Sequence, residues 1–300
     1  MKASYLFALV AIQLAMAVNC WGQTPNTASN KSPRVITLTP HLAEIVDAAG
    51  GASMLVGVSA HSNRPSTLKE LPVISDARSI DLERIKNLQP TLIIYWQSGT
   101  PNTQIEALKK YFANTPTKLL STDPRKLEDI AKDIERIGQA LGTTGKAQQS
   151  AQKFRERLQL LRQKYGPDQK TNTRSVRVFY QIWAQPLMTL NREHLIGDMI
   201  QLCGGEQLFA NEKLLVPTVS RESVVAADPE TIFTAVDNPK IKTDWSMWSS
   251  LPHLSATKNE AFVEIDGDTI SRPSPQILIG TEKMCDAIWR IKQMRSSKAP

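Results

Sequence analysis

Short apolar runs alternate with amphipathic stretches along most of this chain. In the first half, strand-type and helix-type patterns take turns at 35–38, 42–49, 54–59, 82–88, 91–96, 104–112, 118–121 and 126–141. The second half holds strand-type runs at 176–183, 231–235 and 261–265 and helix-type patterns at 194–203, 221–227 and 275–294. This alternation is typical of a parallel sheet covered by helices on both faces. It predicts the α/β class.

A long helix is predicted at 144–165, between the two halves. Small and apolar side chains recur there every three or four residues, at Ala147, Ala151, Phe154, Leu158, Leu161 and Tyr165. At about 1.5 Å per residue, the helix is about 33 Å long. We therefore predict two Rossmann-like lobes joined by a long rigid helix, with a ligand cleft between the lobes.

The two halves share a local pattern. Residues 81–94 read DLERIKNLQPTLII and residues 220–233 read SRESVVAADPETIF, each with a Glu followed seven residues later by a Pro. A looser echo places Glu44 six residues before Gly50 and Asp198 six residues before Gly204. The pattern favours two similar lobes. The alternative is that the order of helix, proline and strand recurs by chance, without two similar lobes.

The N-terminus has the features of a secretory signal peptide. Lys2 precedes a mostly apolar run, and Ala15-Met16-Ala17 has the form of a cleavage site. The predicted organisation is a signal peptide at 1–22, a disordered lead-in at 23–33, a first lobe at 34–143, the connecting helix at 144–166 and a second lobe at 175–298. The mature protein is expected in the periplasm. Lipid attachment at Cys20 is the less favoured alternative, because Asn19 stands where a lipobox has a small residue.

Cysteine content and charge narrow the picture further. Beyond Cys20, the chain holds only Cys203 and Cys285, an even pair in an oxidising compartment. A disulfide between them is predicted, and two buried free thiols are the alternative. The net charge of +7 is spread along the chain and forms no basic stripe interleaved with aromatic residues, so no nucleic-acid partner is expected.

The sequence lacks recognisable catalytic and metal-binding motifs. The four histidines include no pair at helical spacing with a glutamate, and no metal site is predicted. The sequence contains no nucleophile elbow and no phosphate-binding glycine loop. We therefore predict a binding protein without enzymatic activity or cofactor. An exported chelatase-like enzyme is the alternative from another class.

Aromatic residues stand where predicted strands end. Trp96 closes one strand, and Tyr180 and Trp183 close another. Ligands of α/β proteins bind at such strand ends, and flat rings there suit a large, partly apolar planar ligand. For any one of these residues, filling of the core is the competing interpretation.

Polar candidates lie in three turns. His41 and His61 each follow a first-lobe strand, where they could contact a ligand, coordinate a metal or simply complete the turn. A third turn precedes the last helix, and its candidates for the polar rim of the site are Asp268, Thr269, Ile270, Ser271 and Arg272. A solvated loop pair of Asp268 and Arg272 is the alternative.

Several segments together resemble a known family. The runs RVITLTP, VGVS, DLERI and VSRES, with the long interlobe helix, are similar to the helical-backbone class of periplasmic binding proteins, which serve ABC importers. Within that class, the chain most resembles the cobalamin-binding members. The resemblance covers about 34–294 and implies a corrinoid ligand, a monomer, little lobe closure and a disulfide between Cys203 and Cys285.

The resemblance also implies a docking role for the repeated glutamates. In the family, one glutamate on each lobe pairs with arginines of the permease dimer, and Glu83 and Glu222 occupy these positions here. Exposed carboxylates of this kind supply orientation more than affinity. The alternative is that each only stabilises the first turn of its helix.

The ligand-binding positions are kept less completely. His61 stands where the family has a tyrosine, and Ala77 and about Val216 stand where it has tryptophans. Trp96, Tyr180 and Trp183 could supply replacement rings. Haem or a ferric siderophore therefore stays open as an alternative ligand of the same fold.

Overall fold

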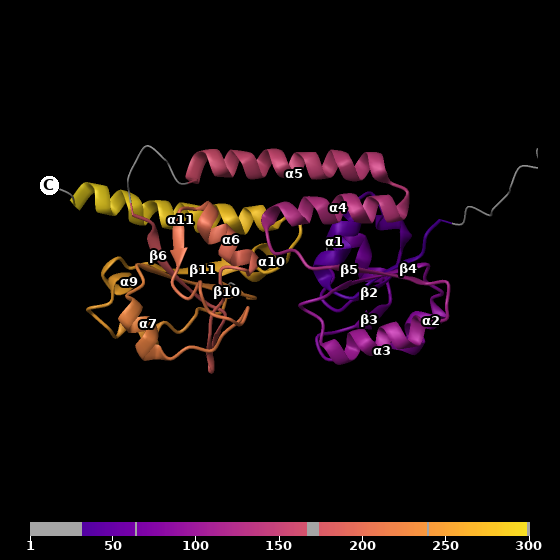
Figure 1. The fold of residues 1–300 in the computed structure, drawn as a ribbon, viewed down its shortest axis with the longest axis horizontal. Coiled ribbons are helices and arrows are strands. Elements are labelled where there is room, and N and C mark those ends of the chain that lie inside the picture. Colours follow the sequence, from indigo (N-terminus) through magenta and orange to yellow (C-terminus); the bar gives the residue numbers. More distant parts are fainter. Residues whose placement is uncertain (1–31, 64, 167–173, 239, 299–300) are drawn as a thin grey trace, which may run out of the picture. The chain divides into compact units, whose positions relative to one another are not determined.

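A parallel sheet of five strands forms the first lobe. The computed structural model describes residues 32–63, 65–166, 174–238 and 240–298 (Figure 1). The strand order is β3-β2-β1-β4-β5. The bounds are β1 (Val35–Thr37), β2 (Leu55–Ser59), β3 (Val73–Ser75), β4 (Leu92–Trp96) and β5 (Lys118–Thr122). The four strands predicted for this half are confirmed, and the short strand β3 is an addition.

Helices cover both faces of the first sheet (Figure 1). Buried side chains of α1 (Pro40–Ala48), α4 (Leu127–Leu141) and α5 (Thr144–Tyr165) pack on one face. Those of α2 (Leu82–Asn87) and α3 (Asn102–Phe112) pack on the other. Two 3-10 turns, η1 (Ala52–Met54) and η2 (Ser66–Glu70), lie in the connections.

The second lobe repeats this plan around a four-stranded parallel sheet of order β11-β10-β6-β9. Its strands are β6 (Val176–Gln181), β9 (Gly205–Gln207), β10 (Thr231–Val236) and β11 (Phe262–Asp266). A small antiparallel hairpin joins β7 (Trp183–Ala184) to β8 (Leu187–Met188). Its helices are α6 (Leu195–Leu202), α7 (Arg221–Ala227), α8 (Ser246–Ser249), α9 (Ser255–Lys258), α10 (Gly267–Ile270) and α11 (Ile277–Lys298).

The predicted strand at 176–183 was too long. It ends at Gln181, because the backbone N–H of Ile182 already bonds to Met188 in the hairpin instead of to the parallel sheet. The predicted helix at 144–165 is confirmed with the same bounds as α5. The α/β class with two lobes is likewise confirmed by the two parallel sheets and their covering helices.

The repeated segments have the same backbone course. In each, a polar N-cap, Asp81 or Ser220, accepts a hydrogen bond from the third residue after it and opens a short helix. Each segment then passes through a left-handed residue with φ of 47°, Gln89 or Asp228, directly before its proline. The strand that follows is β4 or β10, and both are interior strands of their sheets. In strand order, β2-β1-β4-β5 corresponds to β9-β6-β10-β11.

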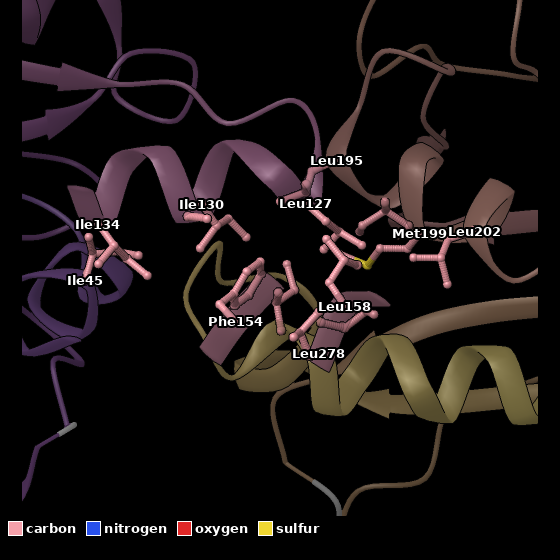
Figure 2. Packing of buried hydrophobic residues seen from close by; sticks show 14 of the residues in the cluster. Ile45, Leu127, Ile130, Ile134, Phe154, Leu158, Leu195, Met199, Leu202 and Leu278 are labelled. Atoms are coloured by element: carbon pink, nitrogen blue, oxygen red, sulfur yellow. The ribbon is translucent and has the colours of Figure 1, made fainter. Parts of the chain in front are cut away.

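One apolar core runs through both lobes. Leu127 of α4, Phe154 and Leu158 of α5, Met199 of α6 and Leu278 of α11 belong to a single buried cluster (Figure 2). Each of these side chains is at most 4% exposed. Complete burial of such a side chain contributes about 1.5–3 kcal/mol. Residues 33–300 accordingly form one compact unit.

The predicted disulfide is present. Cys203, at the end of α6, is bonded to Cys285 of α11, with 4.6 Å between their Cα atoms. The two thiols are therefore not free, and the bridge ties two helices of the second lobe together within the shared core.

The predicted signal peptide, most of the lead-in and Cys20 lie outside the described residues. Among the helices that the structure describes, none is both long and apolar enough to cross a membrane.

Candidate functional site

A cleft opens where strands of both sheets end. A cavity of about 470 Å³ lies mainly against the first lobe, and one of about 290 Å³ lies mainly against the second. Trp96, at the end of β4, and Ser271, just after α10, line both cavities. The two cavities therefore adjoin at Trp96 and Ser271, and together they are called the cleft below.

Trp96 is held in place by its neighbours. The His41 ring meets it edge to face, with 5.0 Å between ring centroids and an interplanar angle of 88°. Gly99 packs against the indole so closely that a Cβ atom there would lie 1.9 Å from Cε3 of Trp96. Only a glycine leaves room for the ring in this position. The turn after β4 therefore fixes the orientation of the central aromatic surface.

Four residues that line the first cavity carry buried polar atoms without a partner. Nε2 of His41, Nε1 of Trp96 and Oγ1 of Thr39 and Thr100 are buried and have no hydrogen-bond partner among the described residues. An unpaired buried polar atom costs about 1–3 kcal/mol. Four such atoms lie directly behind one cavity wall, where a small shift of their side chains would bring them to a ligand or water.

Burial keeps His41 uncharged. It is 3% exposed, and burial, followed by the positive charge of Arg272, lowers the pKa of His41 to about 3. At neutral pH the imidazole is therefore a neutral hydrogen-bonding group in the cavity wall.

Arg272 joins the two lobes at the rim of the cleft. Its guanidinium lies 2.7 Å from Oδ1 of Asp268 and 3.3 Å from Oε1 of Glu44. It also donates to the side chain of Asn63 at 2.9 Å and to the carbonyl of His61 at 3.4 Å. Most of its donors are thus engaged by the protein itself.

The second cavity is more apolar. Tyr180 of β6, Ile182, Ala235 and Val216 contribute to its walls. The hydroxyl of Tyr180 is buried, and burial raises the pKa of Tyr180. His194, which caps α6 by accepting a hydrogen bond from the Ile196 N–H, also lines this cavity.

The positive charge of Arg125 reinforces the effect of burial on this second histidine. Burial, and to a smaller degree Arg125, lower the pKa of His194 to about 4. His41 and His194 are therefore both neutral at pH 7.

Most predicted site residues come together in the cleft. His41, His61, Trp96 and Arg272 line the first cavity, Tyr180 and Ile270 line the second, and Ser271 lines both. The others do not line either cavity: Asp268 supports Arg272, the Thr269 hydroxyl donates to the carbonyl of Asp266, and Trp183 is 62% exposed on the β7–β8 hairpin.

Two substituted positions also lie in the walls. Ala77 lines the first cavity and Val216 lines the second. The resemblance described above implies tryptophans at 77 and at about 216, whereas the side chains present here offer no ring to a ligand.

Sequence reasoning missed several lining residues. Thr39 and Thr100 are short hydroxyl side chains in turns, which carry no periodicity or motif. Arg125 and His194 come from opposite lobes and meet only through the fold. A signal for His194 was its place before a helix-type pattern. No group of three or more potential metal-ligating side chains occurs within the described ranges.

The two repeated glutamates are on exposed helices. Glu83, in the first turn of α2, accepts a hydrogen bond from the hydroxyl of Tyr111 at 2.6 Å. Glu222 occupies the corresponding place in α7, where the hydrogen bond from its own backbone N–H and that from Ser220 lower its pKa. Both carboxylates thus lie on the surface of their lobes.

Comparison with known proteins supports the fold and the family. A family model described as periplasmic binding protein matches residues 35–269. A vitamin B12-binding protein of Vibrio parahaemolyticus serotype O3:K6 is 35% identical over 273 residues, which cover 89% of this chain and 94% of the relative. One of Yersinia pestis is 32% identical over 258 residues, covering 86% and 87%.

Solved structures share the architecture. The periplasmic vitamin B12 binding protein of Vibrio cholerae superimposes with a TM-score of 0.75 at 31% identity, covering 87% of this chain and 98% of that one. A periplasmic haem-binding protein of Roseiflexus sp. RS-1 reaches a TM-score of 0.72 at 20% identity over 87% and 99%, which shows the fold alone. With two lobes, a shared core and a cleft at the strand ends, the chain belongs to the periplasmic binding protein family.

Proposed function

We propose that this protein captures cobalamin or a related corrinoid in its cleft and delivers it to an ABC importer. The cleft carries the argument, because it combines a fixed tryptophan ring with buried polar atoms that lack partners. A corrinoid offers a flat macrocycle for the ring and peripheral amides for the polar atoms. Relatives named vitamin B12-binding proteins match nearly the whole chain, which supports the same ligand class.

The first test is calorimetric titration of residues 23–300 with cyanocobalamin, with haemin run in parallel. We expect one-to-one binding of cyanocobalamin and weaker binding by the Trp96→Ala variant. Trp289→Ala is the matched control, because Trp289 is 48% exposed on α11 and lines neither cavity. Absence of cyanocobalamin binding, or an equal loss in both variants, would contradict the proposal.

Haem is the second candidate, and His41 is the observation that favours it. Its imidazole is neutral, lines the cavity and keeps Nε2 without a partner among the described residues, so it suits axial coordination of iron. Tight haemin binding with a shifted Soret band, lost in His41→Ala, would favour haem over the corrinoid.

A role in solute binding without catalysis fits the residues of the cleft. Proteins of this family capture a solute, and the cleft residues provide contacts rather than a nucleophile with an adjacent base.

Export to the periplasm through the segment at 1–22 completes the proposal. Mass spectrometry of protein recovered from the periplasm would give the mature N-terminus, and recovery of the uncleaved chain would contradict export by cleavage.

Docking to the permease is proposed to use Glu83 and Glu222. One exposed carboxylate on each lobe would pair with arginines of a permease dimer and set the orientation of the complex. Charge reversal of both residues should abolish uptake while leaving ligand affinity unchanged. The control reverses Glu106 and Glu206, one exposed glutamate on each lobe outside the repeat. Loss of ligand affinity, or equal loss of uptake in the control, would contradict docking.

A further inference from the structure

Two carboxylates reach from one lobe into the other. Glu44 of α1 is 6% exposed, and its Oε2 accepts a hydrogen bond from the hydroxyl of Ser274 at 2.6 Å. Its Oε1 lies 3.3 Å from the guanidinium of Arg272. In the opposite direction, Oδ2 of Asp198 in α6 accepts a hydrogen bond from the backbone N–H of Leu127 at 2.8 Å. Each contact therefore joins a first-lobe residue to a second-lobe residue.

The two contacts occupy matching places in the repeated plan. Helix α1 follows β1 and leads to β2, just as α6 follows β6 and leads to β9. Each acid stands six residues before a glycine with positive φ, 84° at Gly50 and 74° at Gly204. The looser of the two sequence echoes therefore marks positions that are equivalent in the fold.

Both acids meet the beginning of a long helix in the opposite lobe. Leu127 is the first residue of α4, and Ser274 lies just before α11, where its hydroxyl also accepts from the N–H of Gln276 at 3.3 Å. The N-terminus of a helix carries unpaired N–H groups and a partial positive charge. Asp198 accepts such an N–H directly, whereas Glu44 accepts from the Ser274 hydroxyl and from Arg272, and hydrogen bonds to a carboxylate contribute more than neutral ones.

We propose that Glu44 and Asp198 are positioning residues that fix the two lobes against each other and thereby fix the width of the cleft. This inference rests on the proposed function, since a cleft of fixed width matters only if a ligand fills it. The apolar packing of α5 resists separation of the lobes but has little directional preference. Hydrogen bonds depend on direction, so each of the two contacts fixes the orientation of one lobe relative to the other at its own point. Together, the two contacts resist both hinging and twisting of the lobes.

Glu44 also contacts a residue that lines the ligand site. Through its contact with Arg272, it holds a side chain that lines the first cavity and that is otherwise anchored by Asp268 and Asn63. Without Glu44, Arg272 would lose its link to α1 and would reach the first lobe only through Asn63 and the carbonyl of His61. The cleft would then sample a wider range of openings, and a larger part of the population would be unable to close around the ligand.

The test measures the distance between lobes in the ligand-free protein. Spin labels on noncanonical residues at Lys110 of α3 and Ala226 of α7, both exposed, leave the disulfide intact. Glu44→Gln combined with Asp198→Asn should broaden the distribution of distances between the two labels, measured by pulsed electron paramagnetic resonance. Cyanocobalamin should bind this double variant about tenfold more weakly.

The matched control removes an equally buried carboxylate within one lobe. Glu230 is 6% exposed and pairs with Arg177 and Arg295, all in the second lobe. Glu230→Gln should lower thermal stability without broadening the distance distribution. Ser274→Ala tests the Glu44 contact from its other side and should broaden the distribution, and Ser274→Thr, which keeps the hydroxyl, should restore it.

Opposite results separate the two proposals. A distance distribution as narrow in the folded double variant and in Ser274→Ala as in the wild type would overturn the positioning role. Broadening equal to that of the Glu230→Gln control would overturn it as well. If the wild type bound no corrinoid, the proposed function would fail, whereas the distance measurement would still decide whether Glu44 and Asp198 fix the lobes.

Discussion

The buried His41 should make folding stability depend on pH. In the unfolded chain a histidine titrates near pH 6.5, whereas in the folded protein its pKa falls to about 3 because of burial and Arg272. Between these values, the unfolded chain binds a proton that the folded chain does not. The contribution of neutral His41 to stability is therefore complete above pH 6.5 and is lost as the pH falls toward 3.

The magnitude follows from the size of this window. Each pH unit below 6.5 costs about 1.4 kcal/mol, so lowering the pH from 7 to 5 should cost about 2 kcal/mol through His41. His194 acts in the same direction, because burial lowers its pKa to about 4. Asp133 acts in the opposite direction, because burial raises its pKa to about 6. A comparison with His41→Gln cancels both.

The assay is urea unfolding at pH 7, 6 and 5, followed by tryptophan fluorescence. The wild type should lose about 2 kcal/mol more than His41→Gln between pH 7 and 5. His253→Gln, at an exposed position, is the control and should follow the wild-type profile. Parallel stability curves for the wild type and His41→Gln would refute the reasoning, because the histidine would then be solvated or charged in the folded state.

Three further results are expected. Gly99→Ala should displace Trp96 and weaken cyanocobalamin binding about tenfold. Gly145→Ala is the control, because its new Cβ meets no atom within 4 Å and the affinity for cyanocobalamin should not change. Equal affinities in the two variants would argue against a role of Gly99 in fixing the Trp96 ring. Replacing Cys203 and Cys285 by alanine removes a bridge across 82 residues and should cost about 4–5 kcal/mol in urea unfolding, and a loss below about 1 kcal/mol would contradict this. Because one core runs through both lobes, fluorescence and circular dichroism should report a single coincident unfolding transition, and two separated transitions would contradict the shared core.

The order of the main helices and strands could be predicted from the sequence because each has a recognisable pattern of apolar residues. The connecting helix 144–165 has an uninterrupted apolar stripe, and its bounds agree with the structure, while β4 is a continuous apolar run whose predicted start differs by one residue. Elements of three or four residues, such as β3, β9 and α8, are too short to show a period.

The site was predictable only in part, for a different reason. Trp96 lies at the end of a recognisable strand, and the cleft lies at that end in both lobes. Trp183 was expected to join it, but the strand ends at Gln181 and the chain turns into a hairpin, which leaves the ring exposed. The meeting of Arg272 with Glu44 spans 228 residues, and no local pattern indicates which side chains such a distance brings together.

The shared core has a practical consequence for reporter design. A sensor that carries one fluorophore on each lobe depends on a large change in their separation, and lobes joined by α5 and a common apolar cluster provide little of it. The aromatic centre of the cleft offers a better signal, because a coloured macrocycle stacked on Trp96 would quench the indole emission directly. In this scaffold, optical readout should therefore be built into the wall of the cleft and not into the distance across it.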